Sequence, residues 1–247
     1  MQIRYFKEYS SHLNRDMEFK MYGHAGKLCL CIPCQDGVFY EWEDRGMFKI
    51  MENAIEAGKI QFVTINTIDK ETWSSTGNTG DRMWKQECWI QYIVQELIPS
   101  ALEKGNQPQD AKCVVTGFSL GAGHAANLAF RFPDRFDQCL ALSGVYDMEG
   151  YFFGHHDQHT FENDPCAYLS MIDPNHEYVQ KYNQNQYIFV VGQGAWEDVC
   201  LADTRKLQGI CNSKGINCWF EYWGYDVNHD WVWWYKQFPY YMGIMGY

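Results

Sequence analysis

The chain has 247 residues, of which 46% are hydrophobic and 21% charged, a balance typical of a globular domain and not of a disordered or fibrous protein. Its formal net charge of -11 at pH 7 would repel polyanions, which argues against nucleic acid as a partner and against binding to an acidic membrane surface. The apolar runs fall short of the roughly 20 residues that a membrane helix needs. The polar start of the chain does not resemble a signal peptide, so we expect a cytoplasmic protein.

Two segments at the start of the chain, residues 2–8 and 15–22, alternate polar and apolar side chains, which is typical of half-buried antiparallel strands. Residues 27–34 form a nearly continuous apolar run, as expected of a strand covered on both faces. Helix-like and strand-like segments alternate after this point. The expected helices are 47–57, 81–104, 120–132, 203–213 and 231–242, the last broken near Pro239, and the expected strands are 60–67, 113–116, 139–142, 187–191 and 218–223.

This alternation predicts an α/β fold, with a mostly parallel central sheet, helices on both faces and an antiparallel N-terminal edge. No internal repeat or Gly/Ser-rich linker divides the chain, so residues 1–247 are expected to form one domain. Residues 148–185 are rich in His, Asp and aromatic side chains. We expect them to be irregular and to form a cap or flap. The ten cysteines are interpreted as free thiols, which a reducing compartment permits.

The clearest chemical signal is the sequence Gly117-Phe118-Ser119-Leu120-Gly121, which joins an expected buried strand to an expected helix. Such a sharp turn projects one hydroxyl from a strained backbone, and glycines two residues to either side remove the Cβ atoms that would clash. The N-terminus of the following helix directs its dipole toward a developing oxyanion. The pattern predicts a nucleophilic Ser119. The alternative is a tight turn that carries a bystander serine.

A serine hydroxyl is a poor nucleophile until a base takes its proton. Among eight histidines, His229 follows the last expected strand, where the base of this arrangement lies. The acid that orients it is expected after strand 187–191, where Glu197 and Asp198 compete. We favour Glu197, because Asp198 could instead cap the following helix. The order serine, acid, histidine along the chain is that of the α/β-hydrolase fold.

An oxyanion hole needs two backbone N–H groups about 3 Å from the charge that forms. We expect these from Leu120, next to the nucleophile, and from Gln35, in the loop after the third expected strand. Two other groupings have ligand chemistry. Cys31 and Cys34 have the spacing of a redox pair or of half a zinc site, and the three histidines of residues 154–159 could bind a metal. No second such cysteine pair exists and a polar flap suits the histidines better, so we expect no metal.

Three stretches resemble the putative-esterase family of α/β-hydrolases, which includes S-formylglutathione hydrolases, feruloyl-esterase-like enzymes and mycolyltransferases. They are Pro33-Cys34-Gln35-Asp36-Gly37, the turn at Ser119, and the segment from Trp223 to Trp231, WGYDVNHDW. Pro33-Cys34 replaces the His-Gly that usually precedes the oxyanion residue of that family. The resemblance covers nearly the whole chain and implies an α/β-hydrolase fold, His229 as the base, a carboxylester substrate and no cofactor.

These features together predict a serine carboxylesterase that hydrolyses a small carboxylic ester or thioester through an acyl-enzyme intermediate. Two alternatives stay open: an acyltransferase that uses the same triad, and a non-catalytic homologue that binds a ligand. The expected partner is a small-molecule ester, and assembly of the chain into a homo-oligomer is also left open.

Overall fold

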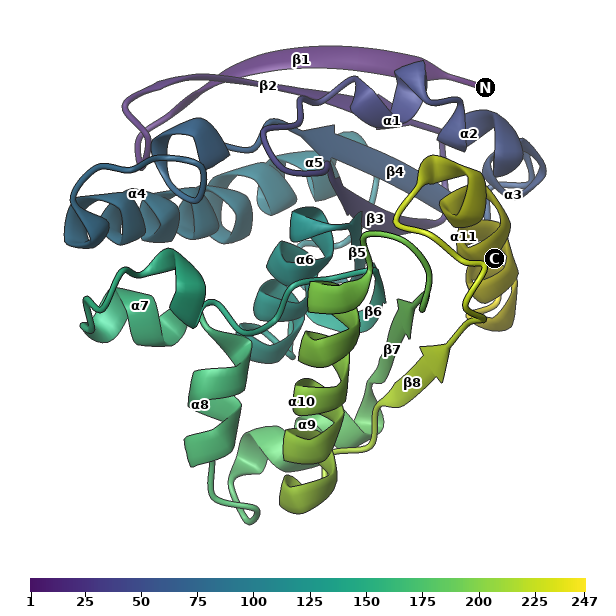
Figure 1. The fold of residues 1–247 in the computed structure, drawn as a ribbon. Helices are drawn as coiled ribbons and strands as arrows, with labels where there is room; N and C mark the ends of the chain where they lie inside the picture. The colour runs from purple at the N-terminus through teal and green to yellow at the C-terminus, as the bar shows by residue number, and fades with distance from the viewer.

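The computed structural model describes residues 1–247 and contains one eight-stranded sheet, in the order β1-β2-β4-β3-β5-β6-β7-β8 (Figure 1). The first two strands pair antiparallel with each other and β2 pairs antiparallel with β4, whereas all later pairs are parallel. The predicted parallel sheet with an antiparallel N-terminal edge is therefore confirmed. The strands are β1 Ile3–Ser10, β2 Arg15–Tyr22, β3 Lys27–Ile32, β4 Ile60–Ile65, β5 Cys113–Phe118, β6 Phe136–Leu142, β7 Gln186–Val191 and β8 Trp219–Tyr222.

Helices cover both faces of this sheet (Figure 1). The α-helices are α1 Glu41–Asp44, α2 Met47–Ile50, α3 Glu52–Glu56, α4 Thr79–Tyr92, α5 Ile98–Lys104, α6 Leu120–Arg131, α7 Gln158–Glu162, α8 Pro165–Met171, α9 Glu177–Gln184, α10 Asp198–Lys214 and α11 Trp231–Ile244. Short 3-10 turns are η1 Asp69–Glu71 and η3 Glu149–Tyr151, and a π-helical segment, η2 Ile93–Leu97, joins α4 to α5. None of the helices is both long and apolar enough to span a bilayer.

The sheet separates two apolar cores. In β3, Leu28 and Leu30 face the larger core with α4, α5, α6 and α10, whereas Cys29 and Cys31 face the smaller core with α1–α3 and α11. Successive side chains of a strand point to opposite faces, so a strand that is buried on both sides is apolar throughout. This explains the continuous apolar run that the sequence shows at β3.

The carboxyl ends of the parallel strands lie at the same edge of the sheet, because β3, β5, β6, β7 and β8 all run in one direction. The loops that leave these ends carry Gln35, Ser119, Ser143, Glu197 and His229. In open α/β sheets, ligands bind outside this edge of the strands. The topology therefore gathers residues that are distant in sequence into one region.

Four expectations about individual elements were wrong. Residues 148–185 are largely helical, as α7, α8 and α9, and are not irregular. These helices have five to eight residues, too few to show a hydrophobic period. They begin with local signals instead: Asp157 and Asp164 accept hydrogen bonds from the first turns of α7 and α8, and Pro165 occupies the first position of α8.

The last helix, α11, continues through Pro239 and is not broken there, because Trp234, Phe238 and Tyr241 bury one side of it against the sheet. Packing of this kind outweighs the single backbone hydrogen bond that proline removes.

The helix expected over residues 47–57 is divided at Met51 into α2 and α3. Helix α10 starts at Asp198, five residues earlier than expected, and this changes the surroundings of the candidate acids.

Candidate active site

Ser119 lies in a strained turn between β5 and α6. Its φ is 57° and its ψ is -131°, a conformation that costs a non-glycine residue about 1–3 kcal/mol. A Cβ atom on Gly117 would lie 2.2 Å from the carbonyl oxygen of Gly121, and one on Gly121 would lie 2.2 Å from the carbonyl oxygen of Pro33. Both glycines are needed because backbone segments pass this close to each other. The second contact also shows that the loop after β3 lies against the start of α6.

His229 reaches Ser119 from the loop between β8 and α11. Its Nε2 is 2.9 Å from the Oγ of Ser119, and its Nδ1 is 3.3 Å from Oε2 of Glu197. A carboxylate only accepts hydrogen bonds, so Nδ1 carries the proton and Nε2 presents a lone pair to the serine hydroxyl. The Glu197 side chain is 1% exposed and that of His229 is 20% exposed.

The loop that carries Glu197 is hydrogen bonded to the loop that carries His229. The His229 N–H donates to the carbonyl oxygen of Ala195 at 3.0 Å, and the Ala195 N–H donates to Oδ1 of Asn228 at 2.8 Å. The Gly194 N–H also donates to the carbonyl oxygen of Val227. These bonds fix the candidate acid relative to the candidate base.

Of the two carboxylates left open by the sequence, the structure brings Glu197 to His229. Asp198 is the first residue of α10 and is exposed. Glu197 occupies the N-cap position, yet its side chain makes no capping hydrogen bond. It points to the interior and is thereby free to contact the imidazole.

Ser143, at the end of β6, was not singled out from the sequence. Its Oγ donates to Oε1 of Glu197 at 2.6 Å and accepts from Nε1 of Trp234 at 3.1 Å. The Gly192 N–H lies 3.4 Å from the same carboxylate oxygen. Ser143 has a φ of 54°, so it too is held in a strained conformation. The one sequence signal was its position directly after an apolar strand, β6, which pairs with the strand that precedes Ser119.

Cys200 is a second neighbour of the imidazole. It lies one turn after Glu197 on α10, and its Sγ is 3.8 Å from Nδ1 of His229. Burial, followed by the negative charges of Glu197 and Asp203, raises the pKa of the Cys200 thiol. The thiol is therefore a neutral group beside the candidate triad at neutral pH.

The two amides expected to form an oxyanion hole are both available. Neither the Leu120 N–H nor the Gln35 N–H donates to a protein acceptor. The Gln35 side chain is directed elsewhere and donates to Oγ of Ser74 at 2.7 Å. The next residue, Asp36, has a φ of 60°, and its N–H donates to Oδ2 of Asp69 at 3.0 Å.

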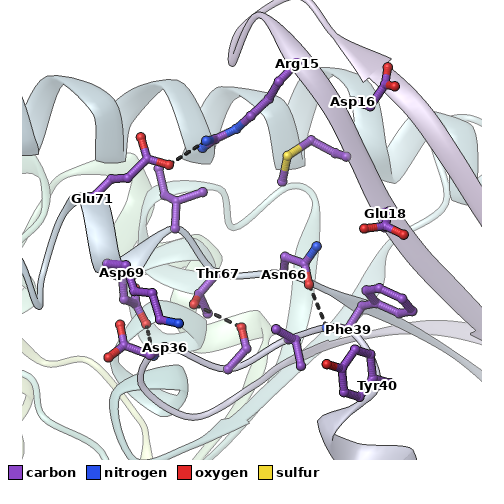
Figure 2. A pocket seen from close by; sticks show the side chains of 15 residues that line it. Arg15, Asp16, Glu18, Asp36, Phe39, Tyr40, Asn66, Thr67, Asp69 and Glu71 are labelled. Carbon is purple, nitrogen blue, oxygen red and sulfur yellow. Dashed lines mark hydrogen bonds and ion pairs between the residues drawn. The ribbon is translucent and has the colours of Figure 1, made fainter.

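The cavity of Figure 2, about 420 Å³ in volume, lies beside this loop and is not the candidate active site. Its polar lining includes Asp36, Asp69 and an ion pair between Arg15 and Glu71, at 2.5 Å, but neither Ser119 nor His229. The figure shows Asp36 and Asp69 hydrogen bonded at the edge of the cavity. The candidate triad lies outside this cavity, where the turn before α6 meets the loop before α11.

The side chains that could hold a metal ion are those of Glu197, Cys200 and His229, whose ligand atoms lie within 4.8 Å of one another. The histidines of residues 154–159 do not assemble three ligands. His155 pairs with Asp157 at 2.8 Å near the start of α7. Cys31 and Cys34 are both free thiols.

The sheet, the strained serine turn and the histidine after β8 define an α/β-hydrolase fold. A model of the family described as "Putative esterase" matches residues 10–243. The chain therefore belongs to the putative esterase family and is a carboxylic ester hydrolase. A sequence search finds no matching curated protein.

Solved structures of similar fold include esterases. A ferulic acid esterase is 17% identical with a TM-score of 0.76, and the match covers 96% of this chain and 95% of that one. An S-formylglutathione hydrolase from Staphylococcus aureus is 14% identical with a TM-score of 0.69, over 99% and 96% of the two chains. MPT51 from Mycobacterium tuberculosis is 14% identical with a TM-score of 0.76, over 99% and 98%. The predicted fold class and family are confirmed.

Proposed function

We propose that this protein is a serine carboxylesterase that hydrolyses a small carboxylic ester or thioester through an acyl-enzyme intermediate. The observation that carries the proposal is the alignment of three groups: Ser119 Oγ lies 2.9 Å from His229 Nε2, and the other ring nitrogen faces the buried Glu197. A hydroxyl, a base and an orienting acid in this order form the machinery of acyl transfer.

In the first half of the reaction, Oγ of Ser119 attacks the substrate carbonyl carbon while its proton passes to Nε2 of His229. The imidazolium that forms is stabilised by Glu197. The carbonyl oxygen becomes an oxyanion and binds the N–H groups of Leu120 and Gln35. Collapse of this intermediate expels the alkoxide or thiolate, which takes the proton from His229, and leaves the acyl group on Ser119.

In the second half, a water molecule gives a proton to Nε2 of His229 and attacks the acyl carbon. A second oxyanion forms at the same two amides. When it collapses, the bond between the acyl carbon and Oγ of Ser119 breaks, and Oγ takes back its proton from His229. The products are a carboxylic acid and the free enzyme.

We propose that the apolar cluster beside Leu120 borders the acyl group. Leu120 packs in a buried cluster with Trp73, Met83, Met148 and Phe152. Two of these residues belong to the segment 148–185, which we propose as the cap of the site. The cap is held to α4, where Thr79 Oγ1 donates to the Phe152 carbonyl oxygen at 3.1 Å.

The test is a panel of oxygen esters and thioesters assayed with the wild type and with Ser119→Ala. We expect turnover by the wild type, labelling of Ser119 by a fluorophosphonate probe, and loss of both in the variant with its fold intact by circular dichroism. Undiminished turnover in Ser119→Ala, or a wild type that neither turns over any ester nor reacts with the probe, would contradict the proposal. Added alcohols that divert the acyl group from water would instead favour the acyltransferase.

A further inference from the structure

We propose that Glu197, Cys200 and His229 form an inhibitory site for a thiophilic divalent cation such as Zn²⁺. Nδ1 of His229 is 3.3 Å from Oε2 of Glu197 and 3.8 Å from Sγ of Cys200, and the three side chains each offer a ligand atom within 4.8 Å of those of the other two. Tetrahedral zinc with ordinary bond lengths separates nitrogen, oxygen and sulfur ligands by about 3.3–3.6 Å. The three side chains are therefore close to the spacing that a zinc ion requires.

The fold holds two of the ligands before any ion binds. Glu197 and Cys200 are three residues apart at the start of α10, which places their side chains on one face of the helix. Oε1 of Glu197 accepts from Ser143, so Oε2 is the oxygen left for a ligand bond. His229 closes the group from the opposite loop and is the most exposed of the three. Three protein ligands leave a fourth position for water.

A cation at this place would stop the base from working. In the active state Nδ1 bears the imidazole proton and Nε2 accepts the proton of Ser119. A metal bound to Nδ1 takes the lone pair of that atom, so the single proton of neutral imidazole moves to Nε2. Nε2 then has no lone pair for the serine. Cys200 binds as the thiolate, and its proton is released to solvent.

The experiment measures inhibition of ester hydrolysis by ZnCl₂ in the wild type, in Cys200→Ala and Cys200→Ser, and in the control Cys88→Ala on α4. Each variant is compared with its own metal-free rate. We expect reversible inhibition of the wild type and of Cys88→Ala, restored by a chelator. We expect the inhibition constant to rise roughly tenfold or more in both Cys200 variants. Equal inhibition of the Cys200 variants, or no inhibition of the wild type, would overturn the inference.

A second readout does not depend on turnover. Co²⁺ added to Ser119→Ala should give a thiolate-to-cobalt charge-transfer band that disappears when Cys200→Ser is added to the same chain. If the protein failed to hydrolyse esters, the band would still appear. If hydrolysis occurred and no band formed, the metal site would be refuted and the esterase proposal would stand.

A different observation assigns a positioning role to Asp69, which rests on the proposed function. Its Oδ2 accepts from the Asp36 N–H at 3.0 Å, and its Oδ1 is 3.1 Å from Nε2 of His124. The side chains of Asp69 and His124 are 1% and 2% exposed. His124 lies on α6, five residues after Ser119, and Nε2 of Gln86 lies 3.4 Å from its other ring nitrogen.

One buried carboxylate therefore contacts both segments that supply the proposed oxyanion-hole amides, the loop with Gln35 and helix α6. Oδ2 of Asp69 accepts from the Asp36 N–H and so fixes the peptide group between Gln35 and Asp36. Oδ1 of Asp69 contacts His124 and so fixes the helix that begins with Leu120. Because Asp36 has a φ of 60°, the loop needs such a restraint to keep its turn. We infer that Asp69 sets the position of the Gln35 amide relative to the Leu120 amide.

The test compares Asp69→Ala with Asp69→Asn, which keeps an acceptor for the Asp36 N–H. We expect kcat to fall on the order of 10²-fold in Asp69→Ala, with KM little changed, and to fall less in Asp69→Asn. Affinity for a trifluoromethyl ketone, which binds as an oxyanion, should fall in parallel with kcat. A folded Asp69→Ala protein with unchanged affinity for this ketone would refute the positioning role, whereas a wild type without turnover would refute the esterase proposal itself.

Discussion

Ser143 holds one carboxylate oxygen of Glu197: its hydroxyl donates to Oε1 at 2.6 Å, while the other oxygen, Oε2, lies 3.3 Å from Nδ1 of His229. The hydroxyl in turn accepts from the indole of Trp234. A buried carboxylate that is bonded on both oxygens has one orientation available, and this orientation directs it to the imidazole.

Replacement of Ser143 by Ala should lower kcat roughly tenfold, because a hydrogen bond to a charged group contributes about 1.5–3 kcal/mol. Ala at this strained φ is no worse than Ser, so backbone effects are matched. Steady-state kinetics test the prediction, with Ser213→Ala, an exposed serine at the end of α10, as the control. Equal kcat values in the two variants would show that the hydrogen bond from Ser143 to Glu197 does not contribute to catalysis.

Glu197→Gln and Asp198→Asn distinguish the two candidate acids. Gln keeps the shape of Glu197 but can donate to Nδ1, which places the imidazole proton on Nε2, so we expect kcat to fall on the order of 10³-fold or more. Asp198 is exposed, and Asp198→Asn should stay near the wild-type rate. The reverse pattern in kcat would assign the acid to Asp198.

Gly121→Ala should destabilise the protein by about 2 kcal/mol or more and reduce activity, because the new Cβ would lie 2.2 Å from the carbonyl oxygen of Pro33. The collision pushes the loop that carries Gln35 away from α6. Gly209→Ala, in the middle of α10 with no atom within 4 Å of its Cβ, should instead stabilise by about 0.5–1 kcal/mol. Urea unfolding of both variants measures these changes in the free energy of unfolding. An unchanged value for Gly121→Ala would show that the loop containing Pro33 can move away from α6 without cost.

Asp164 predicts a particular pH dependence of stability. Burial raises the pKa of its carboxyl from 3.8 to about 6. A folded-state pKa above that of the unfolded chain means that the folded protein binds the proton more tightly, so the stability from this group is complete below pH 3.8 and is lost as the pH rises to about 6.

The measurement is the free energy of unfolding of the wild type minus that of Asp164→Asn, taken by urea unfolding across this pH range. The subtraction removes the other titrating groups. We expect the difference to fall as the pH rises, and a difference that is constant or increases would contradict the assigned cause.

The sequence indicates the positions of Ser119 and His229 because each follows directly from a local pattern: a glycine-flanked turn after a buried strand, and the loop after the last strand. The choice between Glu197 and Asp198 has no such pattern. It depends on the residue at which α10 begins, since that decides which carboxylate points inward. Adjacent residues at a helix start differ in direction by about 100°, and the sequence does not reveal this angle.

Ser143, Cys200 and Asp69 could not be predicted, because their roles come from contacts across 54, 29 and 55 residues of chain. No spacing rule connects such positions. The sheet could be predicted well, since apolar strands and alternating edge strands leave strong periodic signals. The short helices α7–α9 could not, because their starts are set by single capping residues.

The hydrogen bonds between the Glu197 loop and the His229 loop have a mechanical consequence. Acid and base are joined by hydrogen bonds between their two loops, whereas Ser119 reaches His229 by one contact, from the turn between β5 and α6. A shift of the two loops together would therefore alter the distance from Ser119 to His229 and leave the distance from His229 to Glu197 unchanged. The contact between the hydroxyl and the ring nitrogen is thus the part of the site that depends on how these loops lie on the sheet.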